Sequence, residues 1–192
     1  MSGTGYPGDP SLTRAAARTT VPDRARVVIV GGGVIGTSIA YHLTRLGWHD
    51  IVLLERDRLT SGTTWHAAGL ITSAGMVDET ALFMSRYSRD LYERLEEETG
   101  LSTGFRPVGH ISIATSPHRM EALRRESLFV QGFGVEDHAL SGEEIADLWP
   151  LLKTDDVVGG FVVADEGRAD PVGVAMSLAR GARMGGATIL EG

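Results

Sequence analysis

The chain has 192 residues, 42% of them hydrophobic, and a formal net charge of −7 at pH 7. The acidic balance excludes a nucleic-acid partner of the usual kind, because phosphate binding needs a basic surface. The absence of cysteine excludes disulfides, zinc–cysteine sites, iron–sulfur clusters and thiol catalysis. No run approaches the length of a membrane span, and the N-terminus lacks the pattern of a secretory signal, so we expect a cytoplasmic protein.

Residues 1–25 are rich in Gly, Pro, Ser, Thr and Ala and show no apolar periodicity. This composition predicts a disordered tail. The stretch "LTRAAARTT" at 12–20 leaves a transit peptide as the alternative, although Asp9 and Asp23 are out of place in an acid-poor presequence.

A strand–helix–strand unit follows the tail. The apolar, β-branched run "RVVIV" at 26–30 predicts a strand buried on both faces of a parallel sheet. The next helix ends at Gly47, and "DIVLLE" at 50–55 predicts the second strand. The helix is expected to bury a stripe of apolar residues at helical spacing: Ile35, Ile39, Leu43 and Leu46.

The remaining elements are less uniform. A long helix is predicted over 79–99, ending at Gly100, with an apolar stripe of Phe83, Tyr87, Leu91 and Leu95. A strand is predicted over 109–116, and Ser116-Pro117 opens another helix. A capping box at 141–144 starts a short helix. The further elements predicted are a glycine-marked strand at 157–165, a helix from Asp170-Pro171 to Gly185-Gly186, and a final strand at "ATIL".

Three glycines carry the strongest chemical signal. Gly31, Gly33 and Gly36 form G-x-G-x-x-G between the first strand and its helix, and Glu55 ends the next strand. In this context the pattern predicts a dinucleotide site. Gly31 allows the tight turn, Gly33 lets the backbone approach a pyrophosphate, and Gly36 lets helix and strand pack closely. Glu55 is expected to bind a ribose diol and, because its charge repels a 2′-phosphate, to disfavour NADP. The adjacent Arg56, also a candidate cofactor-binding residue, weakens this argument against NADP.

The fingerprint does not distinguish FAD from NAD, but the continuation does. An NAD-binding domain usually proceeds to another βα unit, whereas this chain enters the polar loop "SGTTWHAAGL" at 61–70. The hydroxyls of Ser61, Thr63 and Thr64, with neighbouring backbone N–H groups, are suited to a second stretch of phosphate or ribitol.

The chain resembles the sarcosine and dimethylglycine dehydrogenase branch of the glycine oxidase-like flavoenzymes from Arg26 onward. The resemblance rests on "LTSGTTWHAAGL", "LEEETGL" and "PLL…G…D(E)G…DP". It implies FAD joined covalently through His66 to the flavin 8α-methyl carbon, with Trp65 packed against the ring system. It also implies oxidation of a small N-methylated amino acid, with electrons leaving to a flavoprotein or another carrier. Tetrahydrofolate would bind a C-terminal region that lies beyond this chain.

The expected fold is therefore α/β: an FAD-binding Rossmann-like parallel sheet with an inserted, incomplete mixed-sheet α+β substrate domain. The FAD domain is expected at 26–78 and 166–192, and the start of the substrate domain at 79–165. The chain ends two residues after "ATIL", so we expect a piece of a longer enzyme, inactive alone. Its substrate-binding residues are expected after Gly192, and no catalytic residue is assigned.

Three alternatives remain open. The first is another glycine or D-amino-acid oxidase-like flavoprotein. The second is a non-catalytic regulatory relative, which would lack the attachment histidine. The third is an NAD-dependent dehydrogenase, which would need further parallel βα units. No metal site is expected from the histidine spacing. A further group of carboxylates is expected to be solvated loop ends or caps: Asp155, Asp156, Asp165 and Glu166.

Overall fold

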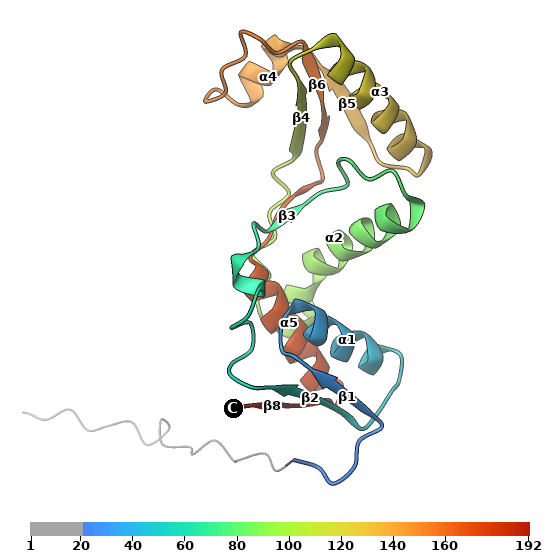
Figure 1. The fold of residues 1–192 in the computed structure, drawn as a ribbon, viewed down its shortest axis with the longest axis vertical. Coiled ribbons are helices and arrows are strands. Elements are labelled where there is room, and N and C mark those ends of the chain that lie inside the picture. The colour runs from blue at the N-terminus through green and yellow to red at the C-terminus, as the bar shows by residue number, and fades with distance from the viewer. Residues whose placement is uncertain (1–20) are drawn as a thin grey trace, which may run out of the picture.

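The computed structural model describes residues 21–192, so residues 1–20, with most of the predicted tail and the alternative transit segment, lie outside it. Figure 1 shows an elongated molecule with a three-stranded sheet at each end. The first sheet contains β1 (Val27–Val30), β2 (Ile51–Glu55) and β8 (Thr188–Glu191) in the order β1-β2-β8. Both of its strand pairs are parallel, as the sequence predicts.

Two helices cover one face of this sheet, α1 (Val34–Arg45) and α5 (Pro171–Met184). The second half of α2 (Glu79–Thr99) joins them, since Leu91 and Leu95 belong to the same buried cluster as Leu53 of β2. We call this assembly the parallel-sheet module: β1, α1, β2, α5, β8 and the second half of α2.

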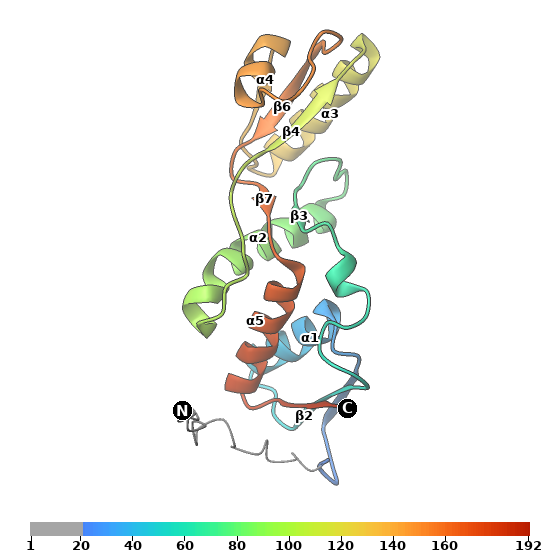
Figure 2. The ribbon, with the colours of Figure 1, turned by 90° about the vertical axis from the view of Figure 1, so that its left-hand side faces the viewer.

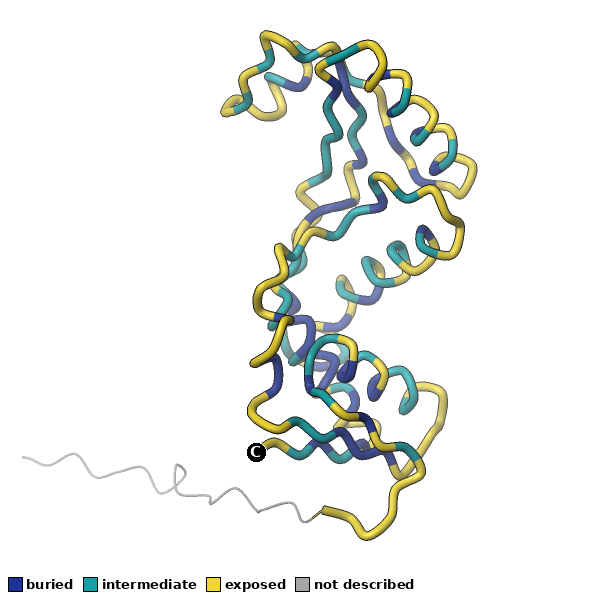
Figure 3. The backbone as a smooth tube through the Cα atoms, in the orientation of Figure 1, coloured by how far each residue is buried: buried dark blue, intermediate teal, exposed yellow. Residues whose placement is uncertain are grey.

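The prediction that β1 is buried on both faces is wrong for the described residues. Val28 is 56% exposed and Val30 is 85% exposed, and Figure 3 shows yellow along this strand. The helices α1 and α5 both lie on one side of the sheet, so side chains that point to the other side meet solvent.

The predicted apolar stripe of α1 is also wrong. Ile35, Ile39 and Leu46 are exposed, and Leu43 is half-buried. The buried face consists of small residues and one tyrosine: Gly36, Thr37, Ala40 and Tyr41. α5 presents Ala175, Ala179 and Ala182 in return. Small side chains bring two helix backbones close, and the periodicity argument overlooks them because it weighs bulk.

The second sheet belongs to the antiparallel-sheet module at the other end of the molecule. It contains β4 (His110–Ala114), β5 (Asp137–Leu140) and β6 (Gly159–Val163), in the order β4-β6-β5. α3 (Pro117–Gly132) and α4 (Gly142–Leu148) complete this module. Both strand pairs are antiparallel, so the mixed pairing expected of the insertion is not seen among these three strands. β5 was not predicted.

Two short strands lie between the modules. β3 (Leu70–Ile71) pairs antiparallel with β7 (Gly167–Arg168), and an isolated bridge joins Arg106 to Arg168. Figure 2 shows these connecting segments running along the long axis between the two sheets. The single-turn helix η2 (Thr64–His66) precedes β3 and contacts α5.

The predicted helix caps are present. Ser116, Ser141 and Asp170 each accept a backbone N–H of the helix that follows, and Ser141 forms the full capping box with Glu144. The apolar stripe predicted on α2 is only half correct, because Phe83 and Tyr87 are exposed. The first half of the helix buries Leu82 instead, against Val130, Val135 and Val163. In the part of the chain that the structure describes, no helix is long and apolar enough to cross a membrane.

Candidate functional site: a dinucleotide-binding edge with a histidine segment

The glycine loop lies at the carboxyl edge of the parallel sheet, directly after β1. Gly31 has φ +107, a conformation that side chains disfavour, and its N–H donates to the Leu54 carbonyl at 2.8 Å. A Cβ added at Gly36 would overlap the Gly31 carbonyl oxygen. Gly31 therefore makes the turn and Gly36 permits the close approach of α1. These are the roles that the sequence predicts for the two glycines.

Glu55 at the end of β2 is tied to this loop. Its Oε2 accepts the Gly32 N–H at 2.7 Å, and its Oε1 accepts the Asp57 N–H at 3.0 Å. The backbone donors of Asp57 and then Gly32 lower the pKa of the Glu55 carboxyl below its ordinary value. The carboxylate is thus held ionised beside the loop.

Sequence reasoning missed Gly32. A Cβ there would lie 2.5 Å from Leu59 Cδ2 and 2.9 Å from Glu55 Cβ, so only glycine lets the acidic residue approach the loop. The signal was present in the sequence, since the second of three consecutive glycines is a position that the G-x-G-x-x-G pattern leaves free.

The candidate cofactor-binding residues of the following loop differ in their burial. Arg56, Ser61 and Thr63 are exposed, and Arg56 forms an ion pair with Asp57 at 3.6 Å. Thr64 is buried, and its Oγ1 accepts the Val34 N–H, the first amide of α1, at 2.9 Å. The structure thus brings Thr64 to the same helix end as Gly33.

His66 ends η2, and its ring is exposed beside that of Trp65. The ring centroids are 3.7 Å apart and the ring planes are inclined by 33°. Trp65 therefore covers one face of the imidazole and leaves an indole surface toward solvent. The predicted contact of Trp65 with a flavin stays a prediction.

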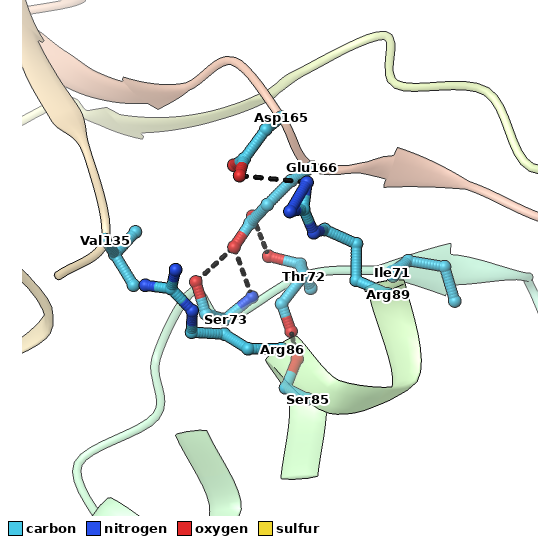
Figure 4. Close-up of a pocket in the computed structure, with 9 residues that line it drawn as sticks. All are labelled: Ile71, Thr72, Ser73, Ser85, Arg86, Arg89, Val135, Asp165 and Glu166. Carbon is cyan, nitrogen blue, oxygen red and sulfur yellow. Dashed lines mark hydrogen bonds and ion pairs between the residues drawn. The ribbon is translucent and has the colours of Figure 1, made fainter. Parts of the chain in front are cut away.

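Glu166 differs from its prediction as a solvated loop end. It is 4% exposed and accepts the Thr72 hydroxyl at 2.6 Å, with the N–H and hydroxyl of Ser73 on its other oxygen. Figure 4 shows these contacts in a small pocket, where Arg89 pairs with Asp165 at 3.0 Å. The partners of Glu166 lie more than 90 residues away in the chain, so no local pattern indicates its burial.

The residues at the sheet edge fit an FAD molecule. α1 begins directly after the glycine loop, no acidic side chain occupies the first turn of this helix, and Glu55 lies at the neighbouring strand end. Such a helix end attracts phosphate, and an acidic residue at this place suits a ribose diol.

Comparison with known proteins decides the family. Residues 26–192 match the family model described as DAO, FAD dependent oxidoreductase. The chain belongs to this DAO family. The α/β fold with a parallel FAD-binding sheet, predicted from the sequence, is thereby confirmed.

Two DAO-family relatives agree with the predicted branch. The chain is 42% identical over 171 residues to mitochondrial sarcosine dehydrogenase of Homo sapiens, which covers 89% of this chain and 19% of that protein. It is 42% identical over 164 residues to mitochondrial dimethylglycine dehydrogenase of Rattus norvegicus, covering 84% and 19%. The predicted resemblance to this branch is confirmed.

A third relative and one solved structure widen the comparison. The mitochondrial pyruvate dehydrogenase phosphatase regulatory subunit of Mus musculus is 39% identical over 181 residues, covering 93% of this chain and 20% of that protein. The structure of L-proline dehydrogenase from P. horikoshii matches with a TM-score of 0.81 and 26% identity, covering 89% of this chain and 45% of that one. The chain spans about a fifth of the length of the three curated relatives.

Proposed function

We propose that this chain is the FAD-binding part of an enzyme that oxidises the N-methyl group of a small amino acid, sarcosine or dimethylglycine. The observation that carries the proposal is the placement of η2, with His66 at its end, against the phosphate-binding end of α1 through the Thr64–Val34 hydrogen bond. One short segment thus joins the nucleotide site to the histidine of the attachment motif.

The roles of this chain's residues follow from their positions. The glycine loop and the amides of α1 that follow Val34 would hold the pyrophosphate, and Glu55 would hold the adenosine ribose. Ser61 and Thr63, exposed beside this edge, would contact the ribitol or phosphates, and Arg56 would lie at the rim. The bound flavin supplies the hydride acceptor for the methyl carbon.

His66 would carry the flavin covalently. Attachment would form one N–C bond between the imidazole of His66 and the 8α-methyl carbon, and would break one C–H bond of the methyl group and the N–H bond of the ring. It would release two protons and would need dioxygen as the acceptor of two electrons. A neutral imidazole nitrogen is the nucleophile that this step requires.

The partners of the whole protein are part of the same proposal. They are an N-methyl amino acid, an electron-accepting flavoprotein or another carrier, and tetrahydrofolate as acceptor of the one-carbon unit. The location that we propose is the cytoplasm. The sarcosine and dimethylglycine dehydrogenase relatives are named as mitochondrial, so fractionation of cells that produce the protein is the test of location.

The second candidate is a regulatory role, favoured by the regulatory-subunit relative. A regulatory subunit has no need of an attached flavin, and the presence of His66 in the attachment motif argues for the enzyme.

The covalent attachment of FAD is tested by acid precipitation. Acid-precipitated full-length protein is expected to keep yellow flavin in the pellet, and a tryptic peptide containing His66 should carry the mass of FAD. His66→Ala should bind FAD but release it on precipitation. His118→Ala, an exposed histidine in the first turn of α3, is the control and should retain covalent flavin.

The outcome against the proposal is equally direct. Wild-type protein that releases all its flavin into the acid supernatant refutes the attachment. Protein that holds flavin but is not reduced by sarcosine or by dimethylglycine refutes the substrate class. Protein that binds no flavin at all favours the regulatory role.

A further inference from the structure

The first amide of α1 is capped by a residue from elsewhere in the chain. A helix N-terminus leaves N–H groups without helical partners, and the N-cap residue usually provides a side-chain acceptor. The N-cap of α1 is Gly33, which has no side chain. The Val34 N–H instead donates to Thr64 Oγ1 at 2.9 Å, across 30 residues of sequence.

Gly33 and Thr64 fit one another. A Cβ added at Gly33 would lie 2.9 Å from Thr64 Oγ1, closer than real side-chain contacts allow, and it meets no other atom within 4 Å. In this structure the missing side chain of Gly33 therefore leaves room for the threonine hydroxyl. Thr64 is 7% exposed, so the hydrogen bond is shielded from water.

A second contact holds the same two segments together. The Thr60 N–H donates to the Gly32 carbonyl at 3.0 Å, and Thr60 is itself buried with φ +70. The glycine loop is thus joined to the start and to the end of the segment 60–64, and His66 follows two residues later.

We propose that Thr64 is a positioning residue, a remote cap of α1 that fixes where His66 lies relative to the phosphates bound at the same helix end. The inference rests on the proposed attachment of FAD at His66 and adds to it the residue that sets its geometry. Since the hydroxyl hydrogen of Thr64 is not used in accepting from Val34, the side chain would be able to donate to a phosphate oxygen while it caps the helix.

A positioning role and a phosphate-binding role of Thr64 predict different changes in the kinetics of FAD attachment. A residue that only binds phosphate changes the FAD concentration needed for half-maximal attachment. A residue that sets the approach of His66 to the 8α-carbon changes the rate at saturating FAD, because a misplacement of about 1 Å slows a reaction roughly 100-fold.

The test measures covalent attachment after FAD is added to flavin-free protein of full length. The variants are Thr64→Val, which replaces the hydroxyl by a methyl group, and Thr64→Ser, which keeps it. The control is Thr44→Val, which removes a hydroxyl from within α1, near its opposite end, where the Thr44 hydroxyl donates to the Tyr41 carbonyl at 2.7 Å. Flavin retained in the acid-precipitated pellet is followed over time at increasing FAD concentration.

Thr64→Val is expected to attach FAD at least about tenfold more slowly at saturation, with Thr64→Ser and Thr44→Val within about twofold of wild type. A saturating rate for Thr64→Val equal to wild type overturns the positioning role, and a change in half-saturation alone assigns Thr64 to phosphate binding only. If Thr64→Val protein is recovered unfolded, Thr64→Ala carries the same expectation, because it removes the hydroxyl without adding bulk.

The two proposals fail in different ways. Wild-type protein that never retains flavin in the pellet refutes attachment at His66, and with it the positioning role. Wild-type protein that attaches FAD while Thr64→Val and Thr64→Ala attach it equally fast refutes the role of Thr64 alone.

Discussion

Replacement of Glu55 tests the link between the glycine loop and the cofactor. The carboxylate accepts two backbone N–H groups, at 2.7 Å from Gly32 and 3.0 Å from Asp57. Hydrogen bonds to a charged group contribute about 1.5–3 kcal/mol each when shielded, and less here because Glu55 is half-exposed. Glu55→Ala should therefore lower the free energy of unfolding of the FAD-free protein by about 1–3 kcal/mol.

FAD affinity should fall in addition. Loss of a charged acceptor for the ribose diol costs about 1–3 kcal/mol of binding free energy, which raises the dissociation constant about 5- to 150-fold. Glu55→Gln keeps one acceptor oxygen but turns an N–H donor toward a backbone N–H, so it should show an intermediate loss.

The assay is a flavin titration of each variant, followed by urea unfolding with and without FAD. Glu144→Ala is the control, since Glu144 also accepts a backbone N–H and also has a lowered carboxyl pKa, but lies in the capping box of α4. The FAD affinity of Glu144→Ala should equal that of wild type. Equal affinity in wild type and Glu55→Ala would refute the ribose role, and unchanged stability would refute the role of Glu55 in holding Gly32.

The acid dependence has a definite sign. Because the native pKa of Glu55 is lowered, its stabilising contribution is present above the ordinary carboxyl pKa and is lost as pH falls through the lowered native value. Wild type should therefore lose more stability than Glu55→Ala on acidification in this range.

Two further predictions concern packing. Gly36→Ala should destabilise the protein by about 1–3 kcal/mol in urea unfolding, because the new methyl group would meet the rigid Gly31 carbonyl. The control is Gly132→Ala in α3, whose methyl group would meet no atom within 4 Å, so its stability should be equal to or above that of wild type. Equal stabilities of the two variants would contradict the close approach of Gly36 to Gly31. Burial, with the 2.6 Å hydrogen bond to Glu98, raises the pKa of Tyr41 to about 12. Tyr41 should therefore contribute about 1–3 kcal/mol to the fall in the free energy of unfolding of wild type between pH 10 and 12, where the unfolded tyrosine ionises first. Tyr41→Phe should show a smaller fall, which burial of Tyr92 leaves in place by raising the pKa of that phenol; parallel pH curves would rule out this assignment.

Much of the fold was readable from local sequence. The strand–glycine–helix–strand order fixed the βαβ unit, and Glu55 marked the second strand end. Ser116, Ser141 and Asp170 opened helices at the expected places because a capping side chain binds amides only two or three residues away. The roles of Gly31 and Gly36 followed from the same short-range geometry.

The errors arose where the partner of a residue lies far along the chain. Whether Ile35 or Ala40 faces the core depends on α5, more than 130 residues later, whose alanines admit a small-residue face and leave the larger side chains outside. The β1 side chains were expected to be covered because their composition fits a doubly covered strand, but only the arrangement of the helices decides which face is covered.

The sequence by itself determined the strand–glycine–helix–strand unit and the starts of the later helices, because turn glycines, caps and the strand-end acid act over a few residues. Only the tertiary structure decided that Glu166 is buried against Thr72 and Ser73, 94 and 93 residues away, and that Thr64 caps α1 from 30 residues away. A hydroxyl or carboxylate has the same local pattern whether it meets water or a distant amide. Its role therefore depends on which segments the folded chain brings within about 3 Å of it.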